Sequence, residues 1–193
     1  MAITKVAVWN RALAIIGGSK KGMVISENDE SEQAKWLRMF WEDAVDYVVT
    51  LRNWYEALTY VVLAETGDTI EKAEWDVAYT RPPDCLRIIR FTDICDQTKN
   101  YPYAELRNYI LSNETTGYLY YVRNMDYDDV TQMSTGMRSV IAARLAFEVA
   151  GVFKPKMQPV AERAYETALI RAEEMNAESV FQKDGDTPLA EII

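Results

Sequence analysis

The chain has 193 residues, and its 30 Asp and Glu against 21 Lys and Arg give a formal net charge of −9 at pH 7. This acidic excess argues against a protein that wraps a nucleic-acid backbone, because such proteins need clustered Lys and Arg. The sequence contains no histidine, which removes the commonest general base and a common metal ligand and so lowers the expectation of catalysis.

Two helices are predicted at the N-terminal end of the chain. In residues 4–16 the apolar positions share one helical stripe, formed by Val6, Trp9, Leu13 and Ile16. Gly17 and Gly18 then end the pattern. In the polar loop that follows, Asp29 and Glu32 have the spacing of a capping box. Apolar residues recur at steps of three and four through residues 31–51, which predicts a long second helix.

The middle third of the chain is typical of β structure. Residues 54–63 could finish a helix or form a strand, whereas the alternation in residues 74–79 predicts a strand. Pro82 and Pro83 interrupt any regular element, and residues 86–91 predict the next strand. Residues 106–111 and 118–122 predict a hairpin around residues 113–117. We therefore expect three or four strands.

Two further helices are predicted at residues 130–153 and 158–180, and the short connection between them indicates an antiparallel hairpin. Small residues of the first of these helices, Ala142, Ala143, Ala146 and Ala150, would allow a close helix neighbour. After Phe181 the sequence no longer has a helical pattern.

These elements together predict a mainly α (α+β) fold. It would be an antiparallel bundle of about four helices, with a small antiparallel β region inserted in the middle third and an extended C-terminal tail. The expected divisions are residues 1–60 for the N-terminal helices, 61–128 for the β-rich insertion, 129–181 for the C-terminal helical hairpin and 182–193 for the tail.

We predict no catalytic residue, cofactor-binding motif or metal site. Cys85 and Cys95 are too few for a four-ligand metal site, and we expect free thiols in a reducing compartment. Two acidic groups could hold a divalent ion or serve a glycosidase: Glu42 with Asp46, and Asp126 with Asp128 and Asp129. Solvated helix faces and a helix N-terminus are the favoured interpretation of these acids.

Aromatic residues recur along the second helix and beyond it, at Trp36, Phe40, Trp41, Trp54 and Tyr55. A platform for stacking nucleobases is one interpretation. Packing in a core or a protein interface is the favoured one, because the spacing is helical and no basic groove accompanies it. No apolar run approaches the ~18 residues of a membrane span and no signal peptide is visible, so we expect a soluble protein made in the cytoplasm without membrane contact.

The C-terminal tail contains the candidate partner-binding residues, which are Pro188, Leu189, Ile192 and Ile193. An apolar tip behind a charged segment could dock on a partner by strand addition or by insertion into a groove. A frayed terminus is the alternative. We expect removal of residues 187–193 to weaken association with a partner and to leave the fold intact.

Several motifs follow one another in a recognisable order. Residues 12–17 read Ala-Leu-Ala-Ile-Ile-Gly, an acidic segment at 26–34 opens the second helix, and residues 52–55 read Arg-Asn-Trp-Tyr. Residues 79–87 contain a proline–aspartate step into a strand, and Ala-rich helical patterns occupy residues 142–150 and 164–177. In this order, the motifs resemble the tail tubular protein A-like head-to-tail adaptor (connector) family of tailed bacteriophages.

This resemblance implies a non-catalytic structural protein of the virion that is assembled in the host cytoplasm. Family members form a homo-oligomeric ring, typically of twelve subunits, which binds the portal protein and receives the tail nozzle (tail tubular protein). The ring continues the channel through which DNA is ejected, without binding DNA specifically. Two other classes stay open from the residues alone: a carboxylate-based cell-wall hydrolase associated with a virion, and a host helical scaffold protein.

Overall fold

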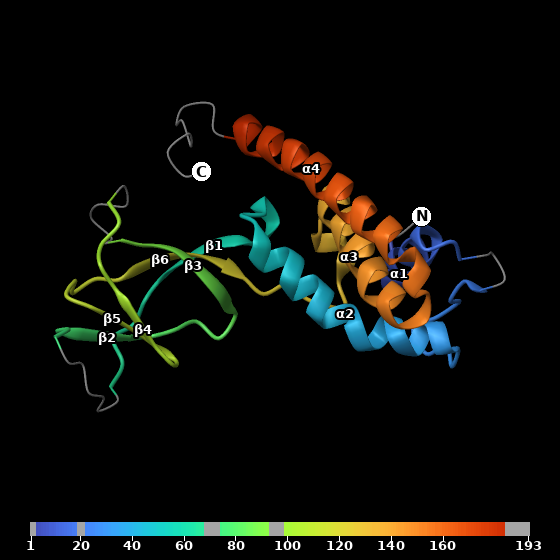
Figure 1. Ribbon diagram of the computed structural model, residues 1–193. Coiled ribbons are helices and arrows are strands. Elements are labelled where there is room, and N and C mark those ends of the chain that lie inside the picture. The colour runs from blue at the N-terminus through green and yellow to red at the C-terminus, as the bar shows by residue number, and fades with distance from the viewer. Residues whose placement is uncertain (1–2, 19–21, 68–73, 93–98, 184–193) are drawn as a thin grey trace. The chain divides into compact units, whose positions relative to one another are not determined.

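The computed structural model describes residues 3–18, 22–67, 74–92 and 99–183, with side chains described up to residue 176. Two compact units divide the chain (Figure 1). A helical unit comprises Met1–Glu56 and Met125–Ile193, and a β unit comprises Ala57–Asn124. The described part of the chain contains no helix that is long and apolar enough to cross a membrane.

The first two helices begin at side-chain caps. Helix α1 (Lys5–Ile15) begins after Thr4, whose side chain accepts a hydrogen bond from the Ala7 backbone N–H. Gly17 follows the helix with φ of 71°, a conformation that glycine adopts without steric cost. Helix α2 (Glu32–Leu51) is capped by Ser31. The expected capping role of Asp29 is therefore wrong, because its carboxylate accepts from the Ser31 and Ile25 N–H groups and shapes the loop instead.

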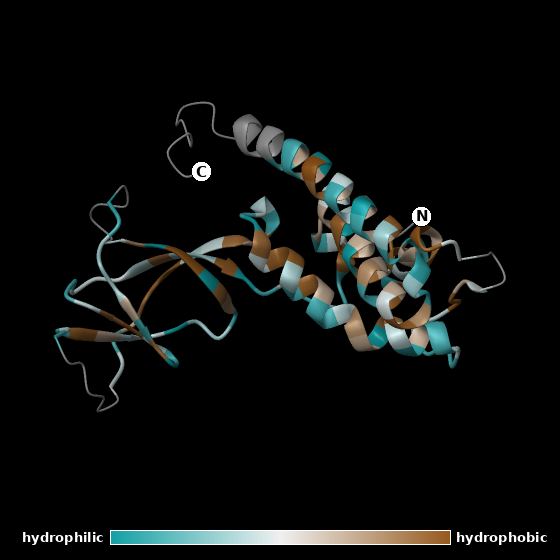
Figure 2. Ribbon diagram, in the orientation of Figure 1, coloured by the Kyte–Doolittle hydropathy of each residue, from teal (hydrophilic) through white to brown (hydrophobic). Residues whose placement is uncertain are grey.

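The last two helices form an antiparallel pair. Helix α3 (Thr135–Phe153) is capped by Ser134, follows a short 3₁₀ turn (Val130–Gln132), and packs against α1, α2 and α4. Helix α4 (Gln158–Lys183) begins after a second 3₁₀ turn (Pro155–Met157). Gly136 lies against Ala172, and Gly151 lies near Gln158, so early α3 meets late α4, as predicted. Hydrophilic and hydrophobic residues alternate along α4 in Figure 2, and its buried described side chains are those of Ala161 and Ala172.

The β unit consists of two antiparallel sheets. One has the order β1-β6-β3, built from β1 (Leu58–Val62), β6 (Tyr118–Arg123) and β3 (Cys85–Thr92). The other has the order β2-β5-β4, built from β2 (Val77–Thr80), β5 (Tyr109–Ser112) and β4 (Ala104–Leu106). A buried cluster from both sheets includes Tyr79, Phe91, Ile110 and Leu119. This unit therefore has a hydrophobic core of its own.

The expected hairpin of residues 106–111 with 118–122 is wrong. Strand β5 pairs with β2 and β4, whereas β6 pairs with β1 and β3. The chain changes sheets at Gly117, where an added Cβ would lie 3.0 Å from the Phe91 ring and 3.1 Å from the Tyr79 ring. A side chain there would crowd both rings, and the segment is a crossing between sheets rather than a hairpin turn.

The expected fold class, a four-helix bundle with a small β region, is also wrong, because the chain is a mixed α+β protein with two three-stranded sheets. Two signals were too weak in the sequence. Strand β1 continues an apolar stretch that could equally end a helix, and β4 and β5 read as one strand. They are separated by Arg107 and Asn108, and Arg107 turns the chain with φ of 53°.

Candidate interaction surfaces

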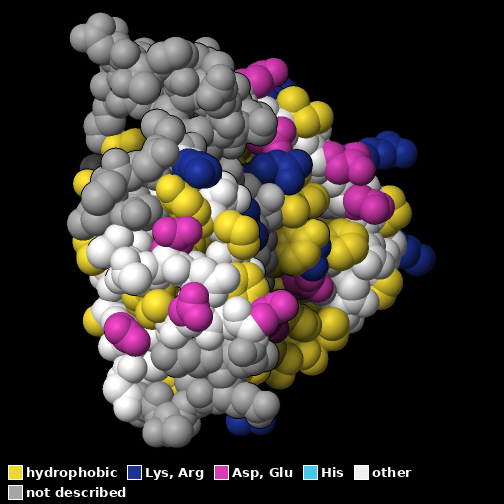
Figure 3. Space-filling model, turned by 90° about the vertical axis from the view of Figure 1, so that its left-hand side faces the viewer, with side chains coloured by type: hydrophobic (Ala, Val, Ile, Leu, Met, Phe, Trp, Pro, Cys, Tyr) yellow, Lys and Arg dark blue, Asp and Glu magenta, His cyan; other side chains and the backbone are white. Residues whose placement is uncertain are grey.

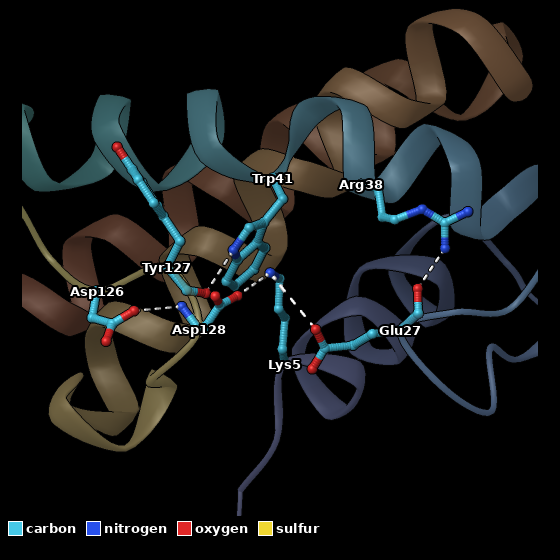
Figure 4. A network of polar contacts seen from close by, with 7 residues as sticks. All are labelled: Lys5, Glu27, Arg38, Trp41, Asp126, Tyr127 and Asp128. Carbon is cyan, nitrogen blue, oxygen red and sulfur yellow. Dashed lines mark hydrogen bonds and ion pairs between the residues drawn. The ribbon is translucent and has the colours of Figure 1, made fainter.

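Lys5 lies at the centre of a polar network in the helical unit (Figure 4). Its Nζ lies 2.8 Å from Asp128 Oδ1 and 3.8 Å from Glu27 Oε2. The same ammonium group lies 5.8 Å from the centroid of the Trp9 ring and 5.5 Å from that of Trp41. The Lys5 side chain is only 12% exposed whereas that of Asp128 is 83% exposed, so water screens the contacts with the two rings less than it screens the ion pair.

The network joins segments that are far apart in the sequence. Trp41 Nε1 on α2 donates to the backbone oxygen of Tyr127 at 2.9 Å. Arg38, also on α2, donates to the backbone oxygen of Glu27 (Figure 4) and to that of Asp29. The loop before α2 and the segment before α3 are therefore both attached to α1 and α2. These contacts stabilise the helical unit.

Of the acidic residues considered as metal or catalytic sites, Asp46, Asp126, Asp128 and Asp129 make local contacts, whereas Glu42 is exposed. Asp126 accepts from the Asp128 N–H, and Asp128 pairs with Lys5. Hydrogen bonds from Thr131 and Gln132 lower the pKa of Asp129, which caps the 3₁₀ turn before α3. Asp46 accepts from the Tyr127 hydroxyl at 2.8 Å. Among the described residues, no group of three or more His, Cys, Asp or Glu side chains could hold a metal ion.

The aromatic series of α2 does not form a stacking platform. Trp41 and Trp54 are buried, and Trp54 Nε1 donates to the Val48 backbone oxygen at 2.6 Å. Trp36 and Phe40 stack on each other at 6.0 Å and are half-buried. Packing in the helical unit thus uses most of this series, as the favoured interpretation expects.

Strand β1 forms an edge of its sheet. It pairs with β6 on one side, and within the described ranges no strand pairs with its other side. Tyr60 is 66% exposed and Val62 is 55% exposed, and the Tyr60 ring stacks on Tyr118 of β6 with 5.5 Å between centroids. An edge strand with exposed apolar side chains is a template for pairing with another chain.

A groove of about 470 Å³ lies between α1, α3 and α4. Arg11, Arg163 and Arg171 line it together with small residues such as Gly136 and Ala168. Asp and Glu are absent from the described residues that line it. Although the chain has a net charge of −9, these three arginines share one surface, which therefore favours an acidic ligand.

Other surface charge is less organised. On the face drawn in Figure 3, acidic and basic side chains are both scattered among hydrophobic ones. The tail residues Pro188, Leu189, Ile192 and Ile193 lie outside the described residues, so their predicted role stays a prediction.

Sequence reasoning missed three features: the Lys5 network, the β1 edge and the arginine groove. A signal for the groove was present, because Arg163, Thr167 and Arg171 recur at steps of four along one predicted helix. The other two features depend on long-range contacts that no local pattern encodes. No family model matches the chain, and a search of curated proteins gives no match either.

Proposed function

We propose that the protein is a head-to-tail adaptor of a tailed bacteriophage, a structural subunit that assembles into a ring between the portal and the tail nozzle. Support comes from the ordered motifs between residues 12 and 177, which resemble those of adaptor proteins. The acidic net charge suits a channel wall that repels DNA rather than holding it. As a virion component it would be assembled in the host cytoplasm.

The observation that carries the proposal is the exposed edge of β1. A protein that binds other subunits exposes apolar side chains before assembly, and leaving these side chains in water costs free energy. Tyr60 and Val62 are such side chains. Because the backbone edge of the same strand is unpaired among the described residues, a neighbouring subunit or the nozzle could add a strand there.

The test is assembly with the portal protein encoded with this chain. The purified proteins are mixed and their masses measured by analytical ultracentrifugation, and we expect several copies of this chain on each portal ring. A chain that never associates with portal or tail protein would contradict the proposal. A monomer in the absence of portal would not, because rings of this kind can require a template.

Variants then locate the surface. We expect Tyr60→Lys combined with Val62→Lys to abolish binding of a neighbour or the nozzle, because buried charge replaces apolar contact. The control is Val160→Lys combined with Ile170→Lys, which adds the same charge at exposed apolar positions of α4. A chain lacking residues 187–193 tests the tail in the same assay. If the Tyr60/Val62 variant and the chain lacking residues 187–193 both assemble as the wild type does, neither β1 nor the tail contacts a partner.

A further inference from the structure

The groove between α1, α3 and α4 has a lining that suits the binding of a helix. Along α4, Arg163, Thr167, Arg171 and Met175 line one side at steps of four residues. They span ~18 Å of helix at 1.5 Å per residue. Arg11 and Ile15 of α1 also line the groove, as do Gly136, Ser139 and Ala143 of α3. Small lining residues allow the ridge of another helix to approach closely.

The charge of this groove is unbalanced. Arg11, Arg163 and Arg171 are exposed and have no ion pair with any described residue. Other arginines of the helical unit are engaged: Arg52 pairs with Glu173, and Arg144 pairs with Glu148. The unpaired guanidinium groups present donors that suit carboxylates or phosphates. The Thr135 hydroxyl, which accepts from Arg138, adds a donor beside them, whereas the Thr167 hydroxyl already donates to the Arg163 backbone oxygen.

Carboxylates are favoured over a phosphate backbone. The rest of the surface carries the acidic excess of a chain with net charge −9, which repels a long polyanion along its whole length, whereas a protein partner needs to present only a few carboxylates at the groove itself. Met175 and Ile15 add apolar side chains to the lining, and Met175 is 49% exposed.

Helix α2 presents a face with this chemistry. Glu42 and Asp43 are exposed and have no partner among the described residues, unlike Asp46, which binds Tyr127. Met39, one turn earlier on the same stripe, is 63% exposed. The stripe therefore offers two free carboxylates beside one flexible apolar side chain.

The groove and this face lie on different sides of the helical unit. Ser139 of α3 lines the groove. Arg144 of α3 lies 3.9 Å from the ring of Tyr47, which follows Asp43 by about one turn of α2. The two α3 positions are five residues apart, or about 140° around the helix at roughly 100° per residue. A subunit with complementary faces on different sides binds its neighbour head to tail, which closes into a ring if the rotation permits.

We infer that the groove lined by Arg11, Arg163 and Arg171 receives the α2 face formed by Met39, Glu42 and Asp43 of a second copy of this chain. The inference rests on the proposed function, because a ring requires each subunit to bind its neighbour through two complementary faces. It adds the residues that make the contact.

Two variants of the full chain test it by sedimentation velocity at low salt, up to ~1 mM protein, where a millimolar Kd is visible. One is Arg163→Glu with Arg171→Glu, which reverses the groove. The other is Glu42→Arg with Asp43→Arg, which reverses the face. We expect the wild type to self-associate, less as salt rises, and each variant alone to lose about tenfold or more in affinity. Mixed together, the two variants should regain association, because the intact face of one meets the intact groove of the other and the two reversed surfaces are also opposite in charge.

Controls with equal charge changes separate this contact from a general charge effect. They are Lys99→Glu with Lys156→Glu for the groove, and Glu162→Arg with Glu166→Arg for the face. Unchanged association of both controls supports the inference. A wild type that stays monomeric at every concentration overturns it, as does unaltered association of the groove variant. Loss of association in the Glu162/Glu166 control overturns the assignment to α2.

Two outcomes separate this inference from the adaptor proposal. Binding to portal with unchanged self-association of the groove variant would overturn the inference alone. Self-association through the groove without any portal binding would uphold the inference and contradict the adaptor function. A DNA duplex that binds the wild type but not the groove variant, with self-association unchanged, would assign the groove to phosphates and overturn the inference.

Discussion

Lys5 contacts two other segments of the helical unit through one ammonium group, which pairs with Asp128 and lies beside the rings of Trp9 and Trp41. We expect Lys5→Met, which keeps the length of the side chain, to lower the free energy of unfolding by about 1–2 kcal/mol. The estimate is modest because Asp128 is well exposed and regains water.

Urea denaturation measures this effect, and Lys35→Met is its control. Lys35 pairs with Glu30 at 3.5 Å, but both side chains are mostly exposed. Loss of that pair should change stability by no more than ~0.5 kcal/mol. Equal losses of stability in the two variants would show that the contact of Lys5 with the two tryptophans adds nothing to the free energy of unfolding.

The Tyr121 hydroxyl makes the stability of the β unit depend on alkaline pH. Burial, together with a 3.0 Å hydrogen bond to the Asp84 carboxylate, raises the pKa of Tyr121 to about 12. In the unfolded chain the phenol ionises near ~10. As pH rises from about 10 to 12, the unfolded state therefore releases the proton first, and stability that is complete below pH ~10 is lost.

The loss reaches at most ~1.4 kcal/mol per pH unit for one group, and Tyr121→Phe removes it. We expect the free energy of unfolding of the wild type to fall more steeply than that of Tyr121→Phe above pH ~10. Other tyrosines with raised pKa, such as Tyr103 and Tyr118, titrate in both proteins and cancel in the difference. Parallel pH profiles would show that the Tyr121 phenol ionises equally in both states.

At the scale of elements, the crossing between the two sheets depends on Gly117. We expect Gly117→Ala to destabilise the β unit by about 1–3 kcal/mol, because a Cβ there would lie 3.0 Å from Phe91 and 3.1 Å from Tyr79. Thermal unfolding followed by tyrosine absorbance measures this. Gly67→Ala is the control, because an added Cβ there meets nothing within 4 Å. If Gly117→Ala costs no more than this control, the rings can move aside.

Local patterns predicted the helices well, since α1, α2 and α4 fall within a few residues of the expected ranges. Each has a capping or breaking residue close to its start, and such signals lie within a few positions in the sequence. The sheets were predicted poorly. A strand has no local signal for its partner, so β5 and β6 looked like a hairpin although they pair with different strands.

The candidate site shows the same limit. Exposure of Tyr60 follows from β1 lying at a sheet edge, and the groove follows from α1 and α4 lying on either side of α3. Both are consequences of tertiary arrangement. The acidic residues, in contrast, were visible in the sequence, and the structure shows that Asp46 and Asp128 serve local contacts.

At the scale of the whole molecule, the β unit is an insertion whose two ends meet. Leu58 at the start of β1 pairs with Val122 near the end of β6, so the first and last strands of the unit lie ~5 Å apart close to its two boundaries. An insertion with adjacent ends can be removed without stretching the parent fold, because a short loop closes the gap at small entropic cost.

We therefore expect a chain in which residues 57–124 are replaced by a short Gly-Ser linker to fold as a helical protein with cooperative unfolding. The Lys5, Trp41 and Asp128 contacts lie wholly within Met1–Glu56 and Met125–Ile193 and should persist. Residues 57–124 alone should also fold, although weakly, because a domain of this size buries a limited core. Amide NMR dispersion and urea unfolding of each piece provide the measurement. A helical piece that loses cooperative unfolding would mean that α3, despite packing on α1, α2 and α4, depends on the β unit for its stability.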